Sequence, residues 1–138
     1  MGTGNLQQLL SSFLTTEADW KKDHCAFAAA DVSQAITGID PIAPVREKIK
    51  GKMTALRFRE SFSRDPGEAM RIIAEEHCGL LPIDPKEAKP GDMGTVVAID
   101  EEGKQIEIAA CRMDKGWFVR GESGYARTPA AKRAWTLP

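Results

Sequence analysis

Residues 20–31 read WKKDHCAFAAAD, so a histidine and a cysteine lead directly into a run rich in alanine. Asp23 is a good N-cap, because its carboxylate can accept a hydrogen bond from a backbone N–H of the first turn, and Gly38 is a good residue to end a helix. The pattern predicts a helix over about residues 24–37, with Cys25 in its first turn. The alanines make this helix slim, so it can pack closely against its neighbours.

Cys25 has two interpretations at this stage. The free N–H groups and the dipole of a helix N-terminus favour a negative charge, so a thiol there has a lowered pKa and can act as a nucleophile. The other interpretation is a small packed residue. A nucleophilic cysteine also needs a base, usually histidine, and the chain has only His24 and His77. The side chain of His24 diverges from its neighbour Cys25, and His77 is expected late in another helix, facing solvent.

The dipeptide HC occurs at residues 24–25 and again at 77–78, and two cysteines with two histidines are a ligand set for zinc. Zinc ligands are usually about two to five residues apart within each half of a site, so adjacent ligands strain the geometry. The stretches GTG and PGDMGTV match no phosphate-loop spacing. We therefore expect no metal and no cofactor. Three cysteines without paired spacing are expected to be thiols.

Helical patterns dominate the chain before Pro82. Leucines and a phenylalanine at helical spacing predict an amphipathic helix over about residues 4–15. A basic stretch over residues 45–62 has one apolar face, interrupted at Gly51. At this net charge a solvated surface explains the basic residues better than a nucleic-acid site does.

Asp65 and Pro66 mark the start of a further helix, as an N-cap followed by a proline at the first helical position. Glu68 in the first turn suits the positive end of the helix dipole. The pattern predicts that this helix runs to about Cys78, where Gly79 ends it.

After Pro82 the pattern changes to short strands separated by turns. Helices followed by an antiparallel meander predict the α+β class. We expect one domain over residues 1–138, with its helical part at about 4–80 and its sheet at about 91–130. The segments that read as strands are MGTVVAI (93–99), QIEIAACRM (105–113) and WFVRG (117–121), followed by a short strand or turn in 125–138.

Composition excludes several classes of protein. The chain has 138 residues, of which 42% are hydrophobic and 28% charged, with a net charge of -1. These values are ordinary for a soluble globular protein and make no electrostatic case for nucleic acid or an acidic membrane. No run is long enough for a membrane span, and the N-terminus does not resemble a secretory signal. We expect the protein to be made in a cytosol.

Six short motifs occur in order along nearly the whole chain, and together they resemble a family of small phage-encoded proteins. That family is similar to the NlpC-type cysteine peptidases within the papain-like amidase superfamily. The motif positions are Trp20, Cys25, Ala29-Ala30-Asp31, Thr37-Gly38-Ile39-Asp40-Pro41, Gly91-Asp92 and Ala134-Trp135.

The resemblance implies a nucleophile at Cys25, at the start of a helix packed on a small antiparallel sheet. In active NlpC-type enzymes the base is a histidine in the strand after the Gly-Asp strand; here that slot falls near Glu107. His24 also stands where the family usually has aspartate. Loss of a general base costs about 10²–10⁴-fold in rate, and a glutamate near a thiol raises its pKa by repulsion.

A retained framework without the base implies a fold kept for another use. The resemblance implies a structural protein of a phage tail or tail tip, made in the host cytoplasm and located in the virion. Its partners would be other tail proteins and copies of itself, with no nucleic acid and no membrane span. Two alternatives stay open: an active cysteine peptidase or amidase that cuts cell-wall peptides, and an accessory protein that never enters the particle.

Aromatic residues suggest a contact surface. Trp117 and Phe118 are adjacent in a predicted strand, so they point to opposite faces, and one of them needs a helix or another chain to cover it. Trp135 lies near the end of the sequence, where little of the chain follows to bury it. The competing interpretation is that the tryptophans are core residues, because tryptophan is highly buried on average.

Overall fold

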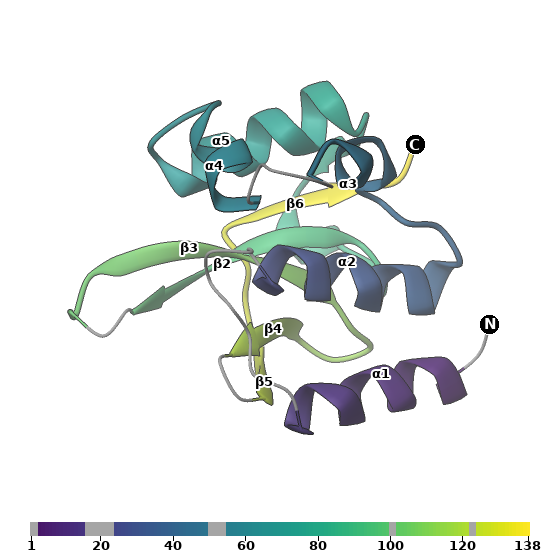
Figure 1. The fold of residues 1–138 in the computed structure, drawn as a ribbon. Helices are drawn as coiled ribbons and strands as arrows, with labels where there is room; N and C mark the ends of the chain where they lie inside the picture. Colours follow the sequence, from purple (N-terminus) through teal and green to yellow (C-terminus); the bar gives the residue numbers. More distant parts are fainter. Residues whose placement is uncertain (1–2, 16–23, 50–54, 100–101, 122–123) are drawn as a thin grey trace.

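The computed structural model describes residues 3–15, 24–49, 55–99, 102–121 and 124–138 (Figure 1). The helices come first: α1 (Thr3–Thr15), α2 (His24–Thr37), α3 (Ala43–Ile49), α4 (Ala55–Glu60) and α5 (Pro66–Ile72), which continues into the π-helical turn η2 (Ile73–His77). The strands are β1 (Leu81–Ile83), β2 (Met93–Ile99), β3 (Gln105–Arg112), β4 (Trp117–Gly121), β5 (Gly124–Thr128) and β6 (Arg133–Thr136), with the short 3-10 helix η3 (Pro85–Glu87) before β2. The predicted α+β class is confirmed. In the described part of the chain, no helix is long and apolar enough to cross a membrane.

The predicted bounds of the first two helices are confirmed. α1 begins one residue earlier than expected, at Thr3, and α2 has the predicted bounds. Gly38 follows α2 with φ of 84°, a left-handed conformation that ends a helix and that glycine adopts without strain. Asp23, the predicted N-cap, lies outside the described residues.

α5 also begins as the sequence predicts. The Asp65 carboxylate accepts a hydrogen bond from the backbone N–H of Glu68 at 3.3 Å, and Pro66 is the first helical residue. The helix then changes to the π-helical turn η2 and ends before Gly79, which has φ of 68°. The basic stretch gives two short helices, α3 and α4, whereas the predicted interruption at Gly51 lies outside the described residues.

The sheet has six antiparallel strands in the order β1-β6-β2-β3-β4-β5. The predicted meander is confirmed from β2 to β5, but the C-terminal segment forms two strands rather than one. β6 does not continue the meander beside β5. It returns to the opposite end of the strand order and pairs with β2 and β1, with Met93 opposite Trp135. The sequence pattern did not predict β1, because Pro82 stands in its centre; β1 is an edge strand, where proline is tolerated.

The two faces of the sheet carry separate apolar clusters. Phe118 packs on the helical face, with its ring centroid 5.5 Å from that of Phe13 in α1. Trp117 packs on the opposite face with residues such as Val96. Trp117 is 2% exposed and Trp135 is 4% exposed, so both are covered within the chain. The opposite directions of Trp117 and Phe118 are therefore confirmed, and of the two interpretations of the tryptophans, core residues or a contact surface, the structure supports core residues.

Gly94 in β2 makes the close approach of Trp117 and β6 possible. A Cβ at Gly94 would lie 2.6 Å from Cζ3 of Trp117 and 2.5 Å from the carbonyl oxygen of Arg133. Both distances are far below van der Waals contact. One of the two atoms belongs to the backbone and cannot turn away, so any larger residue would push β6 from β2.

We expect Gly94→Ala to destabilise the fold by about 3 kcal/mol, at the upper end of the usual cost of overpacking a core. Urea unfolding followed by circular dichroism measures this. Gly121→Ala is the matched control, because the nearest atom to its new Cβ would be 3.7 Å away, and its effect should stay within about 0.5 kcal/mol. Equal stabilities of the two variants would contradict the packing described for β6.

Candidate functional site

Cys25 is the second residue of α2, so the prediction that it lies in the first turn of a helix is confirmed. α2 packs against β3 and β4, as the resemblance implies (Figure 1). Its C-terminal half is fixed to the start of β2, because the Ser33 hydroxyl donates a 2.6 Å hydrogen bond to the carbonyl oxygen of Gly91. The side chains of His24 and Cys25 lie outside the described residues, so the absence of a histidine beside the Cys25 thiol stays a prediction.

The second HC dipeptide is partly buried. The His77 ring lies 4.7 Å from the ring of Phe62 and is partly exposed, so it packs against the chain on one side and reaches solvent on the other. Burial, together with the charge of Asp40, raises the pKa of the neighbouring Cys78 thiol to about 11, although Lys48 acts in the opposite direction. Within the described ranges, no group of three or more histidine, cysteine or acidic residues could hold a metal ion.

Cys111 in β3 is a fully buried free thiol on the helical face of the sheet. Burial raises its pKa far above the ordinary value, and the nearby charge of Asp92 adds to the effect. Cys78 and Cys111 are therefore both protonated at neutral pH and chemically quiet. Neither is a candidate nucleophile.

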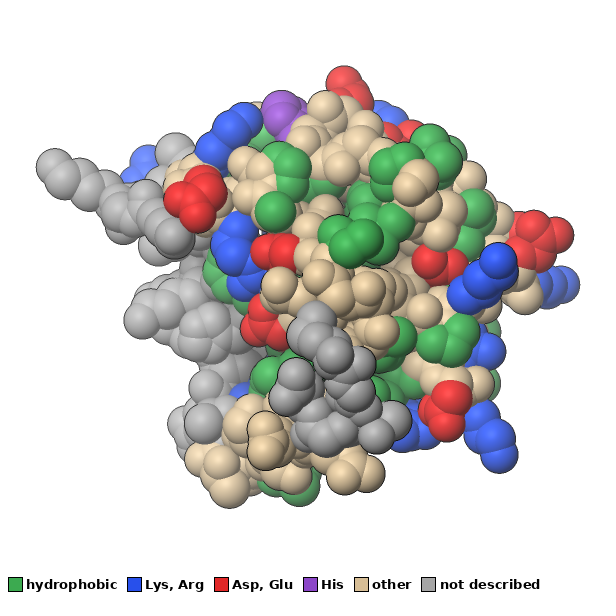
Figure 2. Space-filling model, turned by 90° about the vertical axis from the view of Figure 1, so that its right-hand side faces the viewer, with side chains coloured by type: hydrophobic (Ala, Val, Ile, Leu, Met, Phe, Trp, Pro, Cys, Tyr) green, Lys and Arg blue, Asp and Glu red, His purple; other side chains and the backbone are tan. Residues whose placement is uncertain are grey.

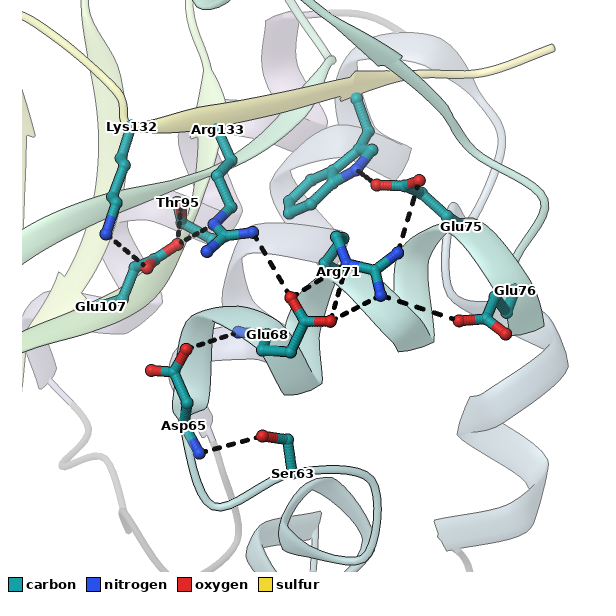
Figure 3. A network of polar contacts seen from close by, with 11 residues as sticks. Ser63, Asp65, Glu68, Arg71, Glu75, Glu76, Thr95, Glu107, Lys132 and Arg133 are labelled. Carbon is teal, nitrogen blue, oxygen red and sulfur yellow. Dashed lines mark hydrogen bonds and ion pairs between the residues drawn. The ribbon is translucent and has the colours of Figure 1, made fainter.

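Glu107, in the slot that the resemblance gives to the catalytic histidine, lies at the centre of a polar network (Figure 3). Glu107 is 8% exposed, and its side chain points to the helical face, like that of Ala109 two residues further along β3. The Thr95 hydroxyl donates a 2.6 Å hydrogen bond to Oε2. Arg133 Nε lies 2.8 Å from the same oxygen, and Lys132 Nζ lies 3.4 Å from Oε1. We call these four residues the Glu107 network.

The contact between Arg133 and Glu107 depends mainly on charge. Arg133 Nε and Glu107 Oε2 are close, but the N–H is not aligned for a hydrogen bond. Arg133 and Lys132 bring two positive charges to this carboxylate, so the negative potential around position 107 is reduced.

The first turn of α5 rests on the carboxylate of Glu107. A Cβ at Gly67 would lie 2.0 Å from Oε1 of Glu107, so this position needs a residue without a side chain. Gly67 is buried, and the helix N-terminus beside it offers the positive end of its dipole to the carboxylate. Glycine thus allows the helix backbone and a buried charge to touch.

A second row of charges continues from Arg133 along α5 and η2 (Figure 3). Arg133 Nη1 lies 3.9 Å from Glu68 Oε2, and Arg71 donates hydrogen bonds of 2.6 and 3.0 Å to Oε1 of Glu68. These hydrogen bonds lower the pKa of Glu68. Arg71 also pairs with Glu75, which accepts a 3.0 Å hydrogen bond from Nε1 of Trp135. The row joins β6 to α5 at Glu68 and to η2 at Glu75.

The acidic residues of the motifs also make structural contacts. Arg46 in α3 donates hydrogen bonds to Asp31 in α2 and to Asp40 in the turn between these helices, at 2.9 and 2.8 Å. Burial raises the pKa of Asp31, although Arg46 opposes the shift. Asp92 accepts a 2.7 Å hydrogen bond from the hydroxyl of Thr136 in β6 and a 2.8 Å hydrogen bond from the backbone N–H of Lys89.

Sequence reasoning placed Cys25 and Glu107 but missed the partners of Glu107. Glu68 and Arg71 are three residues apart on a predicted helix, so their pairing could have been read from the sequence. Thr95 and Arg133 are 12 and 26 residues away from Glu107, and only the strand order brings them together. No local pattern in the sequence signals that contact.

The fold and the network define an α+β protein in which helices pack on a six-stranded antiparallel sheet and a buried carboxylate connects β2, β3 and β6 with α5. The chain belongs to the family described as a domain of unknown function, DUF6950, whose model matches residues 3–137. Comparison with curated proteins gave no significant match, and neither did comparison with solved structures.

We expect Gly67→Ala and Glu107→Ala to be coupled in a double-mutant cycle. Gly67→Ala alone should destabilise the fold by about 2 kcal/mol, because the new methyl group displaces a buried carboxylate. In the Glu107→Ala background the same change should be neutral or stabilising, since alanine is a better helix former than glycine by up to about 1 kcal/mol. The measurement is the free energy of unfolding of the four proteins. Additive effects would contradict the contact.

We expect the pKa of Glu68 to rise toward its ordinary value in Arg71→Gln. Because the pKa of Glu68 is lower in the folded protein than its ordinary value of 4.5, the ionised carboxylate stabilises the fold at pH values above 4.5. This stabilisation is lost as the pH falls through the pKa of the folded state. Carboxyl carbon shifts in NMR titrations report the change directly. Arg127→Gln, which removes an exposed pair with Asp114, is the control and should leave Glu68 unchanged. Identical titrations of Glu68 in Arg71→Gln and the parent protein would overturn this assignment.

Proposed function

We propose that this protein is a structural component of a phage tail or tail tip, built on a degenerate form of the NlpC-type, papain-like amidase fold. Its partners are other tail proteins and copies of itself, and it acts in the virion after synthesis in the host cytoplasm. Two observations support the proposal. Six motifs resemble the phage family, and the position where an active NlpC-type enzyme would have its catalytic histidine is occupied here by Glu107, whose carboxylate is held by other residues.

The order and facing of the elements are consistent with this fold. A papain-like amidase has its cysteine at the start of a helix that packs on an antiparallel sheet, and its base in the strand after the Gly-Asp strand. Here α2 begins one residue before Cys25 and packs on β3. Gly91 and Asp92 directly precede β2, β3 is the following strand, and Glu107 points from β3 to the helical face.

The main observation behind the proposal is that both oxygens of the Glu107 carboxylate are already in contact with other residues of the chain. One oxygen accepts a hydrogen bond from Thr95 and lies against Arg133, while the other lies near Lys132 and directly against the backbone at Gly67. To take a proton from a thiol, this carboxylate would have to give up contacts with two positive charges. The slot therefore supplies a structural ion pair and no general base, and an enzyme without its base loses about 10²–10⁴-fold in rate.

The Glu107 network also suggests why this fold would be kept in a protein without catalytic activity. Removing one partner of a buried charge pair is costly, by about 3–5 kcal/mol, because the other charge stays buried without compensation. Loss of one member of the Glu107 network would therefore disrupt the contact of β3 with α5 and β6. A rigid domain of this kind can serve as a building block, whose function is to be bound by other proteins.

We expect the purified protein to leave peptidoglycan peptides intact, and Cys25→Ala to behave like the parent protein. Release of free amino groups and mass spectrometry of the peptides measure cleavage, with an active NlpC-type peptidase as the positive control. Cleavage that disappears in Cys25→Ala would overturn the proposal and establish the active peptidase instead. Mass spectrometry of purified phage particles is the second arm, and there the protein should be found at a fixed ratio to known tail proteins. Its absence from particles would contradict the structural role.

A further inference from the structure

A groove runs along α1, on the side of the molecule away from the Glu107 network. Its volume is about 750 Å³. One wall is a row of leucines on α1, and the other wall comes from the end of α2, the β3–β4 turn and β5. The apolar residues that line it include Leu6, Leu10, Leu14, Ile36, Met113 and Tyr125.

α1 itself carries no charged residue over its whole length, from Thr3 to Thr15. In Figure 2 the described residues in the lowest part of the molecule, where α1 lies, are drawn almost entirely in tan and green, with charged side chains to their right. Two charged residues line the groove, Asp114 and Arg127, and they pair with each other at 3.4 Å. A charged partner would find no free counter-charge among these lining residues, so the groove suits an uncharged apolar helix.

The leucine row on α1 is self-complementary. Leu6, Leu10 and Leu14 are spaced by four residues and lie along one side of the helix. If two α1 helices lie antiparallel about a two-fold axis at Leu10, each Leu14 meets Leu6 of the other copy. Leu14 is 65% exposed although it borders the groove, so it is available for this contact. Antiparallel packing also brings opposite ends of the two helix dipoles together.

We propose that α1 is a dimerisation helix: two copies of this chain pack α1 antiparallel on α1, and Leu14 of each copy enters the groove of the other. We assign a second copy of the chain to the groove because α1 has the properties that suit a groove without free charge. It is uncharged, it carries a leucine row, and it meets no like charge when it pairs with itself. An interface of this type is isologous, so it closes at two copies and leaves the Glu107 network free.

The test is the oligomeric state of the full chain. Sedimentation velocity of the parent protein, from low to high micromolar concentration, should show a reversible monomer–dimer equilibrium. Leu14→Glu should weaken the dimer at least about tenfold, because it places a charge, once in each copy, where Leu14 enters the apolar groove of the other. Ile99→Glu is the matched control: it introduces the same charge at an apolar residue that is 72% exposed on β2, and it should leave the dimer intact.

A cysteine scan tests the geometry as well as the stoichiometry. In a background with Cys25→Ala, Ser11→Cys lies next to the two-fold axis and should form a disulfide-linked dimer under mild oxidation. Gln8→Cys, on the other side of the helix, should stay monomeric in the same assay. A parent protein that is monomeric at all concentrations, a dimer that Leu14→Glu leaves unchanged, or equal crosslinking through both cysteines would each overturn the proposal.

Discussion

The buried carboxylate of Glu107 joins three parts of the molecule that are far apart in the sequence. It touches Thr95 in β2, Arg133 at the start of β6 and the backbone of α5 at Gly67. An ionised carboxylate is costly to bury unless charges and hydrogen bonds replace its water. Each of these elements therefore has to keep its place for the others to remain stable, and the packing of α5 against the sheet depends on it.

The position of β6 is the constraint that makes this network possible, and it is the part of the fold that the sequence predicted least well. Helix bounds, the cap at Asp65 and the strands β2 to β4 depend on local patterns, which a single sequence contains. β6 follows β5 by a few residues, so a meander would place the two side by side. Instead β6 lies between β1 and β2, where Gly94 gives Arg133 and Trp117 room to approach. That choice is made by packing between distant residues.

The candidate site, like the fold, has features that the local sequence predicts and features that depend on distant residues. The position of Cys25 at the start of α2 follows from the local sequence, and the slot at Glu107 follows from the order of the motifs. The electrostatic character of the slot does not, because it depends on Arg133 and Lys132, which arrive from the end of the chain. Considering Glu107 alone suggested a carboxylate that repels a thiolate. Together with its partners it is a carboxylate paired with two positive charges, which connects β3 to β6.

The contacts of the motif residues help to interpret the resemblance to an enzyme family. Asp31 and Asp40 meet at Arg46, Asp92 accepts hydrogen bonds from Thr136 and Lys89, and the indole of Trp135 donates to Glu75. Most of these contacts connect one element to another, the hydrogen bond between Asp92 and Lys89 lies within one turn, and none of them needs a substrate. A chain under selection for its shape alone would keep them, while a catalytic histidine could be replaced by a residue that packs. The described contacts of the motif residues are therefore structural, and any activity has to be argued from Cys25 and position 107, where the described contacts of Glu107 are ion pairs and a hydrogen bond.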